Sequence, residues 1–151
     1  MSVLAPGTPA PAFTLRTGSG GRFTREDLLG QTTVLVFFPA AFSSVCADQF
    51  NLYQEVLEEL QADGARLYGV SCDATASQSA FREQLGVEIP MLSDFEPKGE
   101  ASRAFGTYHP AGVSTRAIVI LDPDGVVKWS WEGEHPGVLP GANLIFDGLA
   151  A

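Results

Sequence analysis

One stretch of the sequence decides the fold: Val34-Leu35-Val36-Phe37-Phe38-Pro39-Ala40-Ala41-Phe42-Ser43-Ser44-Val45-Cys46. Its first five residues are an unbroken apolar run, which is typical of a strand covered on both faces in a sheet between helices. Pro39 lacks the N–H that a sheet requires, so the strand ends there. Ser43 and Ser44 can cap a following helix, in which apolar residues recur at helical spacing. The stretch therefore predicts a buried strand, a short loop and a helix that begins close to Cys46.

Further strands and helices are predicted on either side of this unit. We expect a short helical turn at 24–30, ending at Gly30, and a tight turn at 122–125 between the last two strands. Their order predicts a parallel βαβ unit joined to a terminal β-hairpin, in one α/β domain over residues 1–151. That domain is expected to have a thioredoxin-like fold, with a central mixed sheet flanked by helices. The predicted strands are 13–16, 34–38, 66–71, 117–121 and 126–131, and the predicted helices are 44–63, 77–85 and 99–105.

Composition excludes several classes of partner. A formal net charge of −9 argues against nucleic acid and anionic membranes, and the longest strongly apolar run, 34–41, is far shorter than a membrane span. The two cysteines, Cys46 and Cys72, are too few for a disulfide scaffold. His109 and His135 have no Cys or His at ligand spacing, so we expect no metal site. No basic, apolar leader opens the chain, and we expect a cytoplasmic protein.

Cys46 is the residue with the clearest chemical signal. A helix N-terminus exposes unpaired backbone N–H groups and the positive end of the helix dipole. Both stabilise a thiolate, so a cysteine in the first turn of a helix is a candidate nucleophile. The position also follows the carboxyl end of a strand, where open α/β sheets bind ligands. From position alone the alternative is a buried structural cysteine.

Residues on two parts of the chain resemble the active site of a known family. The pattern Pro39-x-x-x-Ser43-x-x-Cys46 matches the peroxiredoxin signature Pro-x-x-x-Thr/Ser-x-x-Cys. Arg116 opens a late strand where that family has its active-site arginine. The segment 90–94 is similar to one in the AhpE-like one-Cys peroxiredoxins, and the resemblance covers nearly the whole chain. Further segments that carry it are 11–15, 69–71 and 113–115.

The resemblance implies a thiol-dependent peroxidase that reduces hydrogen peroxide or organic hydroperoxides. Cys46 would attack the peroxide and become a sulfenic acid, while Arg116 would hold the thiolate and polarise the departing oxygen. Ser43 and the Cys46 N–H would bind the peroxide, and Pro39 would shield the thiolate from water. No metal or organic cofactor is implied. An external thiol, either a thioredoxin-like protein or a low-molecular-weight thiol, would resolve the sulfenic acid, and the family resemblance implies a homodimer.

Some residues depart from the family pattern, and some roles stay open. Ser43 stands where threonine is commoner, and Gln49 stands where many relatives carry an acidic residue. Ser43 and Gln49 also exclude a Cys-x-x-Cys oxidoreductase, because neither position three residues from Cys46 is a cysteine. Cys72 is either a buried small residue or a resolving or regulatory thiol. The alternatives are therefore a peroxidase that is resolved internally by Cys72, and a redox sensor or binding protein with little turnover.

Overall fold

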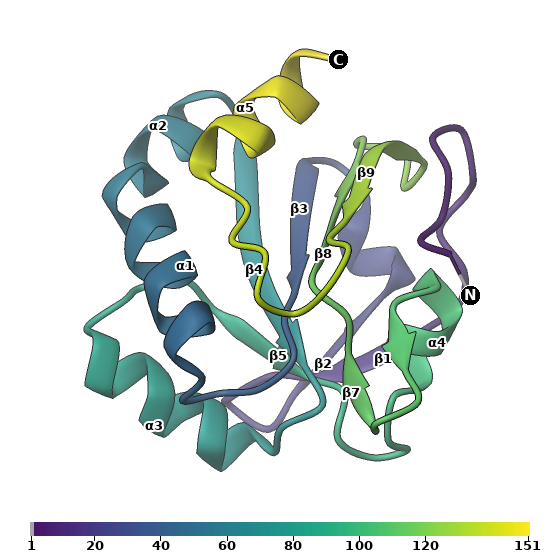
Figure 1. Cartoon of the computed structure of the whole chain (residues 1–151). Helices are drawn as coiled ribbons and strands as arrows, with labels where there is room; N and C mark the ends of the chain where they lie inside the picture. Colours follow the sequence, from purple (N-terminus) through teal and green to yellow (C-terminus); the bar gives the residue numbers. More distant parts are fainter. Residues whose placement is uncertain (1) are drawn as a thin grey trace.

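The computed structural model describes residues 2–151, which form a seven-stranded mixed sheet with helices on both faces (Figure 1). The strands of this sheet are β1 (Thr14–Arg16), β2 (Arg22–Thr24), β3 (Thr32–Phe37), β4 (Ala65–Ser71), β5 (Met91–Ser93), β8 (Ala117–Leu121) and β9 (Val127–Glu132). They lie in the order β2-β1-β5-β4-β3-β8-β9. β4 is parallel to β3 and β5, whereas β8 is antiparallel to β3 and β9. Residue 1 of the predicted domain lies outside the described residues.

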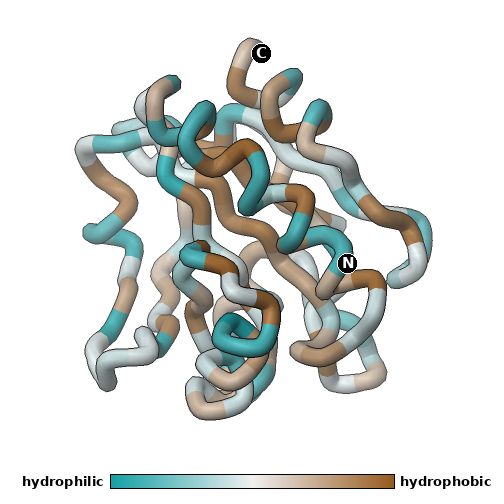
Figure 2. Tube along the Cα trace, turned by 90° about the vertical axis from the view of Figure 1, so that its left-hand side faces the viewer, coloured by the Kyte–Doolittle hydropathy of each residue, from teal (hydrophilic) through white to brown (hydrophobic). Residues whose placement is uncertain are grey.

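The helices divide between the two faces of the sheet. They are η1, a 3₁₀ turn (Arg25–Leu28), α1 (Ser44–Glu55), α2 (Leu57–Ala62), α3 (Thr75–Leu85), α4 (Glu100–Phe105) and α5 (Ala142–Ala150). One core cluster joins α1, α2, α3 and α5 to one face, and a second joins η1 and α4 to the other. Both faces of β3 are consequently buried, as its unbroken apolar run predicts. Figure 2 shows the hydrophobic segments in the interior and hydrophilic ones toward the outside.

The sheet register places the start of β8 beside the end of β3. In this antiparallel pair Phe37 lies opposite Ala117 and Leu35 opposite Val119. The parallel pair on the other side of β3 places Phe37 opposite Val70 of β4. The loop that leaves β3 therefore emerges next to the residue that precedes β8, and also next to the carboxyl end of β4.

Several elements differ from the sequence-based predictions. The predicted helix at 44–63 is interrupted at Val56, which has φ −111° and ψ 9°, so α1 and α2 are separate. The short strands β5, β6 (Tyr108–His109) and β7 (Val113–Ser114) were not predicted, and neither were β2 and α5. The missed strands have two or three residues each and show no clear alternating pattern, so they depend on partners elsewhere in the chain. None of the helices in the described part of the chain is both long enough and apolar enough to cross a bilayer.

Candidate active site

Cys46 lies in the first turn of α1, as predicted. The helix begins after its N-cap residue Ser43, whose Oγ accepts a hydrogen bond from the Cys46 N–H at a long distance of 3.5 Å. The Cys46 side chain is fully buried. Pro39 and Ser43, in the chain that leads from β3 to α1, are half-buried. The thiol therefore lies at the positive end of a helix and out of contact with bulk water.

Arg116 is the second component of the site, and it reaches Cys46 from a distant part of the sequence. Its Nη2 lies 3.3 Å from the Cys46 Sγ. Two further hydrogen bonds hold the same guanidinium: Nη1 donates to Gln49 Oε1 at 2.6 Å, and Nε donates to the Pro136 carbonyl at 2.8 Å. Arg116 is only 2% exposed. The structure therefore places a buried, firmly oriented cation against the sulfur.

A second layer of hydrogen bonds continues from Gln49 along α1. Gln49 Nε2 donates to the Tyr53 hydroxyl at 3.0 Å, and that hydroxyl donates to the Pro140 carbonyl at 2.9 Å. Burial raises the pKa of Tyr53 to about 12, so the phenol is neutral at physiological pH. Sequence reasoning noted Gln49 only as a departure and missed Tyr53. The signal that could have found both is two polar groups, three and seven residues after Cys46, on the apolar face of the helix.

Asp73, which follows β4, hydrogen-bonds to the loop between β3 and α1, and sequence reasoning missed this residue too. Asp73 Oδ2 accepts hydrogen bonds from the Ala41 N–H at 2.8 Å and from the Ser71 hydroxyl at 2.7 Å. Phe42, which follows Ala41 in this loop, has a φ of +68°. This is the left-handed region, which is costly for a residue with a side chain. Its half-exposed ring packs edge-on against Phe81, with the ring centroids 5.4 Å apart. These contacts hold the loop in the shape that presents Ser43 and Cys46.

Cys72 ends up in different surroundings from Cys46. Its Sγ lies 4.0 Å from the Ser114 hydroxyl, and this hydroxyl is hydrogen-bonded to that of Ser102 in α4. Burial, followed by the negative charge of Asp94, raises the pKa of the Cys72 thiol. Cys46 packs in the core cluster on the α1 face of the sheet, whereas Cys72 lies beside Ser114, which links it to Ser102 of α4. Both are free thiols.

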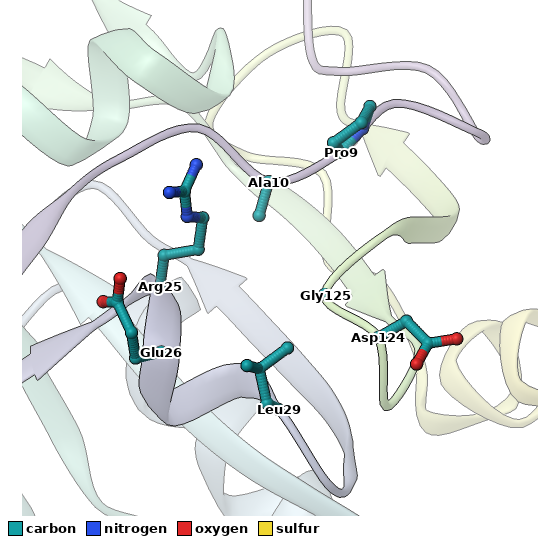
Figure 3. Close-up of a pocket in the computed structure, with 7 residues that line it drawn as sticks. All are labelled: Pro9, Ala10, Arg25, Glu26, Leu29, Asp124 and Gly125. Carbon is teal, nitrogen blue, oxygen red and sulfur yellow. The ribbon is translucent and has the colours of Figure 1, made fainter.

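Several other aromatic and apolar residues lie in the core or line hollows at the surface. Trp129 and Trp131 pack against the core cluster that includes α5, and Phe38 is a fully buried member of that cluster. Val113 is half-buried and lines a hollow of about 290 Å³ together with Arg116. A separate hollow of about 300 Å³ lies between η1 and the turn before β9, and Arg25 and Asp124 are among the residues that line it (Figure 3). Neither hollow is lined by a cysteine.

Comparison with known proteins identifies the family of the chain. The sequence pattern of the AhpC/TSA family matches residues 6–130. The chain is 32% identical over 151 residues to alkyl hydroperoxide reductase E of Mycobacterium tuberculosis, covering 99% of this chain and 98% of that protein. It is also 33% identical over 129 residues to a peroxiredoxin of Aquifex aeolicus, covering 81% of this chain and 58% of the relative. The crystal structure of AhpC from Enterococcus faecalis matches with a TM-score of 0.87 and 29% identity, covering 99% of this chain and 92% of that one. This structural match confirms the predicted thioredoxin-like α/β fold, and the chain belongs to the AhpC/TSA family of peroxiredoxins.

Proposed function

We propose that this chain, acting as a single domain over residues 1–151, reduces hydrogen peroxide or organic hydroperoxides through a sulfenic acid on Cys46. Membership of the family indicates thiol-dependent peroxidase activity. The observation that carries the assignment of Cys46 is the 3.3 Å contact between its sulfur and Arg116 Nη2 in a buried site. A buried guanidinium stabilises a thiolate, which is the nucleophilic form of cysteine.

The proposed first step transfers one peroxide oxygen to sulfur. The Cys46 thiolate attacks that oxygen, the S–O bond forms as the O–O bond breaks, and the departing hydroxide or alkoxide takes up a proton. Arg116 stabilises the charge that develops on the departing oxygen. The 3.5 Å hydrogen bond from the Cys46 N–H to Ser43 Oγ is long enough for a peroxide oxygen to replace it, so both groups can bind substrate. Pro39, which is half-buried in the loop before α1, limits the access of water to the thiolate in this proposal.

The sulfenic acid is resolved by an external thiol in this proposal. A first thiol attacks the Cys46 sulfur and releases water, leaving a mixed disulfide. A second thiol then attacks that disulfide and restores Cys46. The electrons therefore come from two thiols, of a thioredoxin-like protein or a low-molecular-weight compound, and no metal or organic cofactor takes part. The separation of Cys46 and Cys72 onto the two sides of the sheet favours this route over internal resolution by Cys72.

We further propose that the protein is a cytoplasmic homodimer. The free state of both thiols fits a reducing compartment. The half-exposed ring of Phe42, in the loop before α1, supplies apolar surface at the edge near the site, where a second copy could pack. Sedimentation velocity at several protein concentrations tests the dimer, and a monomer at every concentration would contradict it.

A single experiment tests the peroxidase assignment. Reduced protein receives one equivalent of peroxide, and its intact mass is recorded with and without a sulfenic-acid trap. We expect a trap adduct on Cys46 that is absent in Cys46→Ser and retained in the matched variant Cys72→Ser. Thiol-dependent turnover is measured alongside. Protein that stays unmodified by peroxide would refute the peroxidase mechanism, and a trap adduct without turnover would favour the redox sensor.

A further inference from the structure

The buried guanidinium of Arg116 is hydrogen-bonded to no carboxylate among residues 2–151. Its three partners are the Cys46 sulfur, the amide oxygen of Gln49 and the backbone carbonyl of Pro136. The last two are neutral acceptors, which orient a cation without cancelling its charge. A buried charge without a counter-charge is costly. Of these partners, only Cys46 can lower that cost by becoming an anion.

The orientation of the Gln49 amide is decided by the rest of the hydrogen-bond chain. The Tyr53 hydroxyl donates its one proton to the Pro140 carbonyl, so its oxygen is left to accept a hydrogen bond. Gln49 supplies that hydrogen bond through Nε2, and its Oε1 therefore faces Arg116. Each hydrogen bond in the series from Arg116 through Gln49 and Tyr53 to Pro140 therefore pairs a donor with an acceptor. A carboxylate at position 49 has no proton for the Tyr53 oxygen, so the arrangement is specific to an amide.

We propose that Gln49 is a positioning residue that orients Arg116 while leaving its positive charge uncompensated, so that the Cys46 thiolate is its counter-ion. The proposal rests on the peroxidase function proposed above, and it names the residue that sets how strongly Arg116 stabilises the Cys46 thiolate. A glutamate at position 49 would orient the guanidinium equally well, since a carboxylate is a strong partner of arginine. It would also supply a competing negative charge, and the thiolate would gain less from Arg116.

Other ionisable groups around the site do not take the place of that counter-charge. His109, Glu134 and His135 line the hollow beside Arg116, but all three are exposed and none is hydrogen-bonded to its guanidinium. Glu132 is half-buried and accepts a hydrogen bond from the Thr115 hydroxyl instead. Tyr53, which is hydrogen-bonded to Gln49, has a pKa of about 12, so its hydroxyl stays neutral over the pH range of an assay.

The test compares Gln49→Glu with the uncharged variant Gln49→Met. The rate constant for the reaction of Cys46 with hydrogen peroxide is measured by rapid quenching from acidic to alkaline pH, in a Cys72→Ser background. For Gln49→Glu we expect a loss of about tenfold at neutral pH, a pH–rate profile displaced to higher pH, and recovery at alkaline pH. For Gln49→Met we expect a lower rate throughout, because the guanidinium is less well oriented, with no displacement to higher pH.

A second readout separates the charge effect from a loss of structure. The ultraviolet absorbance of the thiolate at neutral pH, which does not depend on turnover, should decrease in Gln49→Glu and not in Gln49→Met. The proposal is overturned if Gln49→Glu keeps the parent profile and absorbance, or if Gln49→Met is displaced to higher pH as well. The pH–rate profile of Gln49→Met tests the proposal even if Gln49→Glu fails to fold. A parent protein that does not react with peroxide would instead refute the proposed function.

Discussion

Replacement of Arg116 by methionine is expected to slow the reaction with peroxide by a large and calculable factor. The guanidinium lies 3.3 Å from the Cys46 sulfur in a site closed to bulk water. A hydrogen bond to a charged group contributes about 1.5–3 kcal/mol net, and two unit charges 4 Å apart attract by about 4 kcal/mol at an effective dielectric constant of 20. Taking about 2–4 kcal/mol for the loss, with about 1.4 kcal/mol for each factor of ten, the rate constant should fall by roughly 30- to 1,000-fold.

The measurement is the rate of formation of the trapped Cys46 sulfenic acid after rapid mixing of reduced protein with excess peroxide. Arg25→Met is the matched control, because Arg25 is an exposed arginine at a hollow that contains no cysteine (Figure 3). It should react at the parent rate. Circular dichroism checks that Arg116→Met remains folded, since the change leaves the buried Gln49 Oε1 and the Pro136 carbonyl without their donors. A folded Arg116→Met that reacts within threefold of the parent would refute the electrostatic argument.

Three further outcomes are expected. Iodoacetamide should modify Cys72 more slowly in the native protein than in urea, as read by peptide mass mapping, because burial and the charge of Asp94 raise the pKa of this thiol. As the pH rises past 9.0, the pKa of this thiol in the unfolded chain, the unfolded thiol ionises before the folded one. The free energy of unfolding should therefore fall with rising pH, and it should fall by less in Cys72→Ala. Equal falls in the two proteins would refute the raised pKa of Cys72. Tyr53→Phe should lower the free energy of unfolding, measured in urea, by about 1–3 kcal/mol, because it leaves the buried Pro140 carbonyl without its donor. An unchanged value would show that this hydrogen bond contributes nothing to stability. Gly69→Ala should cost about 1–3 kcal/mol in the same measurement, because the added Cβ would lie 2.8 Å from a ring carbon of α1. The control Gly18→Ala has room for its Cβ, and equal losses in the two alanine variants would contradict the packing argument.

The two cysteines illustrate how position in the fold separates chemically identical groups. Both follow the carboxyl end of a strand, and both are buried. Cys46 meets a helix N-terminus and the Arg116 guanidinium, which favour the anion. Cys72 is desolvated by burial and faces the negative charge of Asp94, and both favour the neutral thiol over the anion. The expected difference in reactivity therefore comes from the neighbours of each sulfur rather than from its exposure.

The parts of the fold that could be predicted from sequence are those whose signal is local. The apolar run of β3, the stop at Pro39 and the helix that starts at Ser44 lie within adjacent residues, so periodicity and capping preferences were enough to predict them. Of the strands of two or three residues, only β1 was predicted, as 13–16, and the others could not be predicted in this way. β5, for example, has only three residues and is defined by its pairing with β4 and β1. The hairpin of β6 and β7 likewise consists of two paired residues on each side.

The amino-acid sequence alone determined that Pro39, Ser43 and Cys46 share one strand–loop–helix unit, because the chain between them is too short to separate them. Only the tertiary structure decided that Arg116 meets that unit. The antiparallel register of β8 against β3 brings residues about 70 positions apart in the chain into contact, and no local preference encodes such a pairing. The same register gives Gln49 its partner, because the Gln49 side chain on α1 accepts a hydrogen bond from the Arg116 guanidinium only in the folded sheet.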